Sequence, residues 1–262
     1  PDLTVDDLFA QGYGAVFLGC GAQRSRRLDI PGEDLPGIIH AIDLLRMVCL
    51  SPEKATREEL RAHLREQHGL AIGRRAVVIG GGNSAVDVAR TLVRLGVEEV
   101  RILYRRSRQE MPAIPEELHD AEEEGVIVET LVAPRRILGD GRVAALECQR
   151  MALGEPDASG RRRPVPVPGS EFTVEADMVV PAVGQEADYS FLPAGLCDER
   201  GRLIVEPTTG QTCRPGLFAA GDIVQPASVI EAVGAGKQAA AAILRYLRGE
   251  GLPPAAAGKE VV

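Results

Sequence analysis

Residues 76–106 read AVVIGGGNSAVDVARTLVRLGVEEVRILYRR, and this stretch decides the fold. The apolar run Ala76–Ile79 predicts a buried strand, the residues Ser84–Leu95 predict a helix, and Val100–Tyr104 predicts a second strand. A strand, a helix and a strand in this order form a βαβ unit, from which parallel sheets are built. The stretch therefore predicts an α/β fold.

The same alternation continues along the chain. Pro115 begins a further predicted helix that ends near Gly125, and Val126–Val132 predicts another strand. We therefore expect a doubly wound parallel sheet. The turn around Gly139–Gly141 then indicates an antiparallel meander, in which a polar loop over residues 154–170 precedes a returning strand.

A glycine-rich turn joins the first strand of this stretch to its helix. Its residues fit the pattern G-x-G-x-x-A and are Gly80, Gly81, Gly82, Asn83, Ser84 and Ala85. In that pattern the first glycine allows a tight turn, and the second lets the backbone approach a pyrophosphate at the helix N-terminus. The alanine keeps the helix close to the strand. We interpret the turn as a dinucleotide site; the alternative is a turn that only connects two elements.

The far end of the second strand indicates which dinucleotide binds. An NAD site commonly offers an acidic residue there to the ribose 2′-hydroxyl. This chain instead has Tyr104, Arg105 and Arg106. Guanidinium groups can bind a 2′-phosphate through charge-assisted hydrogen bonds, whereas a carboxylate repels it. The sequence therefore predicts NADPH over NADH; the alternative is a solvated arginine face.

Composition excludes several function classes. The net charge is -8 and aromatic residues make up 3%, so a nucleic-acid partner is not expected. No apolar run reaches the length of a membrane span, and the acidic start of the chain is unlike a signal peptide. The five cysteines are scattered without a C-x-x-C pair, which argues against a metal site and favours reduced thiols in the cytoplasm.

A second candidate site follows later in the chain. Residues 217–222 read LFAAGD, and Ser228 with Glu231 has the spacing of a helix capping box. Together with VVIGGGNSAVDVARTLVRLG, YRRSRQEMPAIPEELHDAEEEGV and GEPDASGRRRPVPVPGSEF, these residues resemble the two-dinucleotide-binding flavoproteins. The likeness is greatest to the small (beta) subunit of NADPH-dependent glutamate synthase, and it covers about residues 12–249.

The resemblance implies a domain organisation. A Rossmann-like NADPH domain with connector helices, residues 38–184, would be inserted into a partial FAD-binding domain, residues 1–37 and 185–252, with 253–262 as a loose tail. In such proteins the Gly-Asp carboxylate binds the ribityl chain of FAD, and the next helix begins at the pyrimidine end of the flavin. The residues implied in cofactor binding are Gly184 in the return crossing, Gly221, Asp222, Ser228, Val229 and Ile230.

The resemblance also implies an activity. Hydride would pass from NADPH to FAD, and electrons onward to a larger electron-accepting subunit or an iron–sulfur protein; because the cofactors supply the chemistry, no catalytic side chain is expected. The family's FAD half begins with its own glycine-rich fingerprint, which nothing before Tyr13 supplies. Either the chain is part of a longer protein or the missing piece belongs to another polypeptide. Two alternatives remain: an NADPH-binding scaffold or sensor without turnover, and a relative that reduces another acceptor, such as ferredoxin.

Overall fold

A computed structural model describes residues 3–52, 55–157, 160–226 and 228–253. The chain divides into two compact units. We call residues 25–184 the central unit, and residues 1–24 with 185–262 the terminal unit. The chain passes between the units twice, and at these crossings the short strands β2 (Arg24–Ser25) and β10 (Gln185–Glu186) pair with each other.

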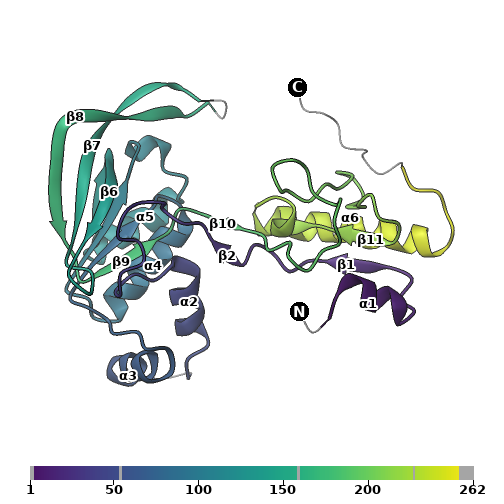
Figure 1. Ribbon diagram of the computed structural model, residues 1–262, viewed down its shortest axis with the longest axis horizontal. Helices are drawn as coiled ribbons and strands as arrows, with labels where there is room; N and C mark the ends of the chain where they lie inside the picture. The colour runs from purple at the N-terminus through teal and green to yellow at the C-terminus, as the bar shows by residue number, and fades with distance from the viewer. Residues whose placement is uncertain (1–2, 53–54, 158–159, 227, 254–262) are drawn as a thin grey trace. The chain divides into compact units, whose positions relative to one another are not determined.

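A four-stranded parallel sheet forms the middle of the central unit (Figure 1). Its order is β5-β4-β3-β9, and helices α4 and α5 make the crossovers from β3 to β4 and from β4 to β5. The elements are β3 (Arg75–Ile79), α4 (Asn83–Arg94), β4 (Glu99–Tyr104), α5 (Pro115–Glu123), β5 (Ile127–Thr130) and β9 (Met178–Pro181). The predicted α/β fold with a parallel sheet is confirmed.

The sheet has a different cover on each face because successive side chains of a strand point to opposite sides. Ala76 and Val78 of β3 pack in a core with α4, α5, α2 (Ala41–Cys49) and α3 (Arg57–His68). Their neighbours Val77 and Ile79 pack against the antiparallel sheet. The unit thus has three layers: helices, parallel sheet and antiparallel sheet.

The antiparallel layer consists of β6 (Val132–Leu138), β7 (Ala145–Pro156) and β8 (Arg162–Glu175). The predicted meander is therefore present, but the predicted polar loop over 154–170 is wrong, because most of it continues the β7–β8 hairpin. Leu153 pairs with Pro164 and Met151 with Pro166. Prolines are tolerated here because β8 is an edge strand, where a missing N–H need not break a ladder. Residues 158–159 lie outside the described ranges.

The predicted strand Val126–Val132 is in fact two strands that belong to different sheets. They meet at Leu131, whose φ of 57° lies in the left-handed region. Its N–H donates to the carbonyl of Arg106 at 3.0 Å, and its carbonyl accepts from the N–H of Met151 at 2.8 Å. These bonds hold the corner at which the chain leaves the parallel sheet for the antiparallel one.

The boundary between the units differs from the one expected from the sequence. Residues 25–37, assigned there to the first part of the FAD half, belong to the central unit. Gly32 lies so close to β6 that a Cβ would be 2.2 Å from the carbonyl oxygen of Ile137. The buried carboxylate of Glu33 accepts from the N–H groups of Leu28 and Asp29 at 2.6 and 2.9 Å. The Glu33 hydrogen bonds fold the segment locally, and the N–H groups of Ile137 and Val143, which donate to the carbonyls of Pro31 and Pro36, attach it to the antiparallel layer.

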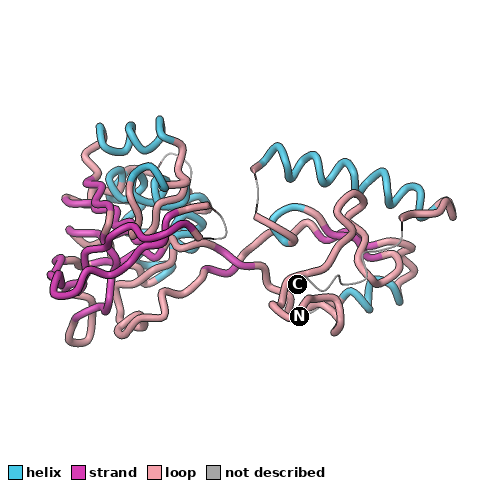
Figure 2. Tube along the Cα trace, turned by 90° about the horizontal axis from the view of Figure 1, so that it is seen from above, coloured by secondary structure: helices cyan, strands magenta, loops and turns pink. Residues whose placement is uncertain are grey.

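The terminal unit is smaller. Two parallel strands, β1 (Val16–Leu18) and β11 (Leu217–Ala219), form its sheet. The unit also contains α1 (Val5–Ala10), the 3-10 turn η2 (Gly221–Ile223) and the 19-residue helix α6 (Val229–Leu247), which Figure 2 shows running along one side of the strands. Residues 254–262, most of the predicted tail, lie outside the description. Nowhere in the described ranges is a helix both long and apolar enough to cross a bilayer.

Candidate nucleotide-binding sites

The first two glycines of the central turn are required by the protein's own packing. Gly80 has φ 155°, and a Cβ there would lie 2.3 Å from the carbonyl oxygen of Ala182, directly after β9. A Cβ on Gly81 would lie 2.5 Å from Cδ2 of the buried Tyr104 ring. These glycines therefore let the turn sit tightly across the carboxyl ends of three strands, β9, β3 and β4.

Gly82 differs from its neighbours because the space beside it is open. A Cβ there would have Pro112 Cγ, at 3.8 Å, as its nearest neighbour. Gly82 is the N-cap of α4, no side chain caps this helix, and its first turn has no acidic residue. Free N–H groups at a helix start, with the positive end of the helix dipole, favour an anion. The geometry thus suits a phosphate at Gly82.

The segment 107–114 forms one wall of this site. It begins with the short turn η1 (Arg108–Glu110), and the Tyr104 hydroxyl donates to the carbonyl of Glu110 at 2.7 Å. The N–H of Ala113 donates to the Gly81 carbonyl at 3.0 Å. The N–H of Ile114 donates to Asn83 Oδ1 at 2.9 Å. The sequence left the role of this segment open; its hydrogen bonds fix it against the glycine turn.

The two arginines after β4 have different surroundings. Arg105 is exposed and, among the described residues, has no ion-pair partner. Arg106 is 7% exposed; its Nε donates to the carbonyl of Arg162 at 2.8 Å, and its Nη2 lies 2.9 Å from Asp157 Oδ2. The expectation that both guanidinium groups face a ligand is therefore corrected: Arg106 is engaged by the β7–β8 hairpin. Sequence reasoning missed Asp157, which it placed in a loop.

The other predicted residues of the central unit lie at two places, the start of α4 and the crossing near Gly184. Ser84 is exposed at the start of α4, whereas Ala85 is fully buried and lets the helix pack closely on the sheet. Gly184 lies two residues beyond Ala182, with φ 111°, and its carbonyl accepts from the N–H of Arg26 at 3.1 Å. Its backbone thus helps to shape the crossing, and no described contact joins it to the glycine turn.

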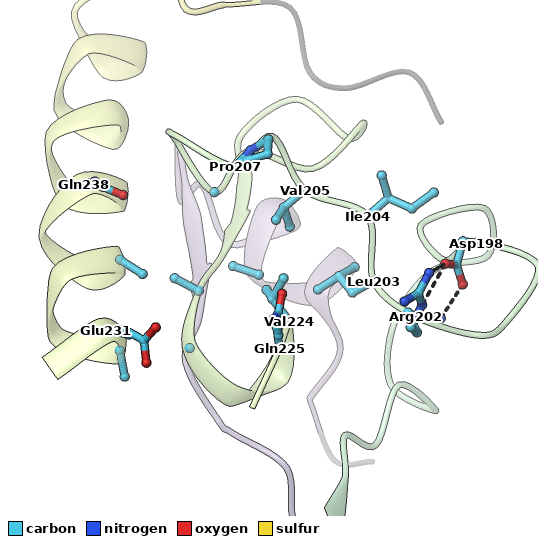
Figure 3. A pocket seen from close by; sticks show the side chains of 16 residues that line it. Asp198, Arg202, Leu203, Ile204, Val205, Pro207, Val224, Gln225, Glu231 and Gln238 are labelled. Atoms are coloured by element: carbon cyan, nitrogen blue, oxygen red, sulfur yellow. Dashed lines mark hydrogen bonds and ion pairs between the residues drawn. The ribbon is translucent and has the colours of Figure 1, made fainter. Parts of the chain in front are cut away.

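The second candidate site lies within the terminal unit. A cavity of about 550 Å³ separates α6 from the segment 198–210 (Figure 3). Gly221, with φ 78°, lines it beside β11, and Asp222 is half-buried in η2. On the far wall the ion pair of Arg202 and Asp198, with Nη2 and Oδ2 2.7 Å apart, closes one end of the cavity.

The start of α6 has the predicted capping box. The N–H and hydroxyl of Ser228 donate to Glu231 Oε2 at 2.8 and 2.6 Å, and the Glu231 N–H donates to Ser228 Oγ. The hydrogen bond from the Ser228 hydroxyl, with that from its backbone, lowers the pKa of Glu231. Val229 and Ile230 are 80% and 84% exposed. A carboxylate thus already lies at this helix start, which weakens its attraction for a second negative charge.

Cysteine and metal chemistry add little to either site. Burial raises the pKa of the Cys148 thiol to about 12, so it stays protonated and unreactive. All five cysteines are free of disulfides. In the part of the chain that the structure describes, no three His, Cys, Asp or Glu residues come together as metal ligands.

Comparison with known proteins identifies the family. The sequence profile of the pyridine nucleotide-disulphide oxidoreductases matches residues 2–238. The chain belongs to this family. Within it, the chain is 45% identical over 256 residues to the NADP(+)-dependent formate dehydrogenase subunit beta of Moorella thermoacetica, a match that covers 94% of this chain and 33% of the relative. It is 37% identical over 254 residues to the glutamate synthase [NADPH] small chain of Azospirillum brasilense, with coverage of 94% and 51%.

The resemblance to the glutamate synthase small chain is thereby confirmed, and the chain spans a third to about half of the length of these two relatives. A solved structure agrees on the fold. FprA of Mycobacterium tuberculosis in complex with NADPH matches with a TM-score of 0.71 and 23% identity, over 94% of this chain and 68% of FprA. The central and terminal units therefore have the fold of a pyridine nucleotide-disulphide oxidoreductase.

Proposed function

We propose that this chain is the NADPH-oxidising part of an FAD-dependent oxidoreductase, which takes hydride from NADPH and passes electrons onward. The observation that carries the proposal is the open, uncapped start of α4 at Gly82, together with the exposed Arg105 directly after β4, which has no ion-pair partner among the described residues. The family also supports a pyridine nucleotide, and the names of two relatives include NADP(+) or NADPH.

The central unit would bind NADPH through three features. The N–H groups at the start of α4 would hold the pyrophosphate, because Gly82 has no Cβ to block the approach. Arg105 would form charge-assisted hydrogen bonds with the 2′-phosphate. The wall formed by residues 107–114 would limit where the adenosine end can lie, since Tyr104 and Asn83 fix that wall.

The terminal unit would hold FAD. The cavity next to Gly221 offers the room, and the half-buried carboxylate of Asp222 can accept hydrogen bonds from the ribityl hydroxyls. The exposed start of α6 at Ser228, Val229 and Ile230 would lie at the pyrimidine end of the flavin. When bound, FAD supplies the hydride acceptor. The protein's residues bind and orient the two cofactors, and no side chain is assigned to acid–base catalysis.

The electron acceptor would belong to a partner. The Moorella relative is a beta subunit and the Azospirillum relative is a small chain, so both are parts of larger assemblies. We propose that this chain likewise passes electrons to a larger subunit or an iron–sulfur protein. We also propose a cytoplasmic location, which suits five cysteines free of disulfides.

A binding experiment tests the nucleotide assignment. NADPH and NADH are titrated into the 262-residue protein and followed by nucleotide fluorescence. We expect the wild type to prefer NADPH, and Arg105→Ala to weaken NADPH binding about tenfold to a hundredfold while NADH binding changes little. The matched control is Arg108→Ala, because that guanidinium is already paired with Glu122. An equal loss of both nucleotides in Arg105→Ala would contradict the assignment.

A second measurement tests the flavin half of the proposal. The protein is mixed with FAD without oxygen, and the visible flavin absorbance is followed as NADPH is added. We expect NADPH to bleach the flavin faster than NADH does. A protein that binds NADPH yet never reduces flavin would instead support the alternative of a nucleotide-binding scaffold without turnover.

A further inference from the structure

We propose that the β7–β8 hairpin takes part in nucleotide selection: Arg106 and Asp157 join the end of the hairpin to the end of β4 and so position Arg105 for the 2′-phosphate of NADPH. Arg106 and Asp157 are thus positioning residues that do not touch the nucleotide. The inference rests on the proposed NADPH site and deepens it.

Three contacts fix Arg106. Its Nε donates to the carbonyl of Arg162 on β8, and its Nη2 pairs with Asp157 directly after β7. Its own carbonyl accepts from the N–H of Leu131 at the corner between the two sheets. The Arg106 side chain is only 8% exposed and that of Asp157 is 25% exposed. Removing one partner of so shielded a pair leaves an uncompensated charge, which is costly.

Arg105 lies between two anchored neighbours. On one side Tyr104 is buried, and its hydroxyl donates to the Glu110 carbonyl. On the other side Arg106 is attached to the hairpin. Both arginines lie in the bend that follows β4, where Arg106 is buried and Arg105 is exposed. The buried guanidinium therefore restrains the backbone that carries the exposed one, and restraint before binding lowers the entropy lost on binding.

Asp157 also makes hydrogen bonds within the hairpin. The Asp157 N–H donates to the Arg161 carbonyl at 2.7 Å, and its Oδ1 accepts from the Arg161 N–H at 3.3 Å. Asp157 thus uses one carboxylate oxygen for the hairpin and the other for Arg106. Because Pro156 pairs with Arg162, both acceptors of the Arg106 guanidinium come from the closing end of the same hairpin.

The test uses two probes that differ only in the phosphate, 2′,5′-ADP and 5′-AMP, titrated calorimetrically into the full chain. We expect Asp157→Asn to weaken 2′,5′-ADP binding about fivefold and to leave 5′-AMP binding unchanged. The direction of the change in 2′,5′-ADP affinity is diagnostic. Removing a carboxylate near a phosphate site would by electrostatics alone strengthen phosphate binding, so a loss reports the lost positioning of Arg105.

Two variants complete the design. Arg106→Lys keeps the positive charge but cannot reach both hairpin acceptors, so it should lose as much 2′,5′-ADP affinity as Asp157→Asn, and the double variant should be no worse than either. Glu147→Gln is the control: it breaks the ion pair that joins β7 to Arg136 of β6, and it should change the binding of neither probe. Unaltered circular dichroism verifies that each variant is folded.

Several results would overturn the inference. It fails if Asp157→Asn binds 2′,5′-ADP as well as or better than the wild type, if both probes weaken equally, or if Arg106→Lys retains full affinity. A wild type that binds 2′,5′-ADP no better than 5′-AMP would contradict the NADPH site itself, and the inference with it. A wild-type preference that survives both substitutions would overturn the positioning role alone.

Discussion

At the scale of single residues, adjacent glycines of the turn should respond differently to the same change. Gly82→Ala meets nothing closer than 3.8 Å and its φ of -95° suits alanine, so we expect a loss of stability of about 1 kcal/mol or less. NADPH binding should nevertheless be lost, because the added methyl group would occupy the path of the phosphate. Gly81→Ala would drive a methyl group into the Tyr104 ring and should destabilise the fold by about 1–3 kcal/mol.

Thermal unfolding and NADPH titration of the two variants measure this contrast. We expect stability and NADPH binding to change separately. Gly82→Ala should stay stable but fail to bind NADPH, whereas Gly81→Ala should be unstable. If Gly82→Ala binds NADPH like the wild type, the phosphate does not approach this helix start, and the glycine turn serves only as a connection.

The sequence could indicate these glycines but not the separate roles of the arginines. The pattern G-x-G-x-x-A follows from the spacing alone, because a tight turn and a close approach require glycine wherever they occur. The pairing of Arg106 with Asp157 joins residues 51 positions apart. No local pattern contains that contact. Strand alternation gives no signal either, because both arginines lie in the bend after β4.

At the scale of elements, the wall of the nucleotide site should depend on one hydroxyl. Tyr104→Phe removes the hydrogen bond to the Glu110 carbonyl and keeps the ring beneath Gly81. We expect the free energy of unfolding to fall by about 1 kcal/mol, because a partly buried carbonyl loses its donor. The segment 107–114 should also open more often. Hydrogen exchange can detect this as faster exchange of the Ala113 and Ile114 N–H groups, whose acceptors are Gly81 and Asn83.

The control for that measurement is helix α3, whose described hydrogen bonds to other elements go to residues 72 and 94–96 and not to Tyr104 or the wall. Exchange in α3 should be the same in both proteins. Uniform acceleration everywhere would mean that Tyr104→Phe lowers global stability only, and that its hydroxyl has no particular part in holding the wall.

Elements were predictable where local chemistry determines them. Hydrophobic runs and helix ends predicted β3, α4, β4 and α5 to within a residue or two, because burial and capping act over a few positions. The corner at Leu131 was not predictable, since a left-handed φ is usually signalled by glycine or asparagine and here tertiary hydrogen bonds hold a leucine in it. The prolines of β8 suggested a loop because their tolerance depends on the strand lying at an edge, a property of the whole sheet.

At the scale of the whole molecule, ionised carboxylates stabilise both units. Hydrogen bonds or ion pairs lower the pKa of acidic residues in each of them. In the central unit these include Glu59, Glu98, Glu122 and Glu124. In the terminal unit they include Asp7, Asp188, Asp198 and Glu231. Half of these eight are exposed and the others are only partly buried, so each contributes little alone, and their effect on stability comes from their number.

The direction of the pH dependence follows from these shifts. Each group has a lower pKa in the folded protein than its ordinary 3.8 or 4.5, so the unfolded chain binds protons more readily. The stabilisation is fully present above these ordinary values and is lost as pH falls through the lower folded ones. We therefore expect a nearly constant thermal midpoint above about pH 6 and a steady fall below about pH 4.5. The midpoint should drop by about 2–4 °C for each kcal/mol lost.

High salt distinguishes the two kinds of contact that lower these pKa values, ion pairs and capping hydrogen bonds. Ion pairs such as Arg74 with Glu98 are screened by salt, whereas the capping boxes of Thr56 with Glu59 and Ser228 with Glu231 are short hydrogen bonds that salt weakens less. Scanning calorimetry across this pH range at low and high salt should therefore show a smaller, but not abolished, fall in the thermal midpoint at high salt. A midpoint that is the same at about pH 3 as at about pH 6 would mean that these carboxylates contribute nothing to the folded state.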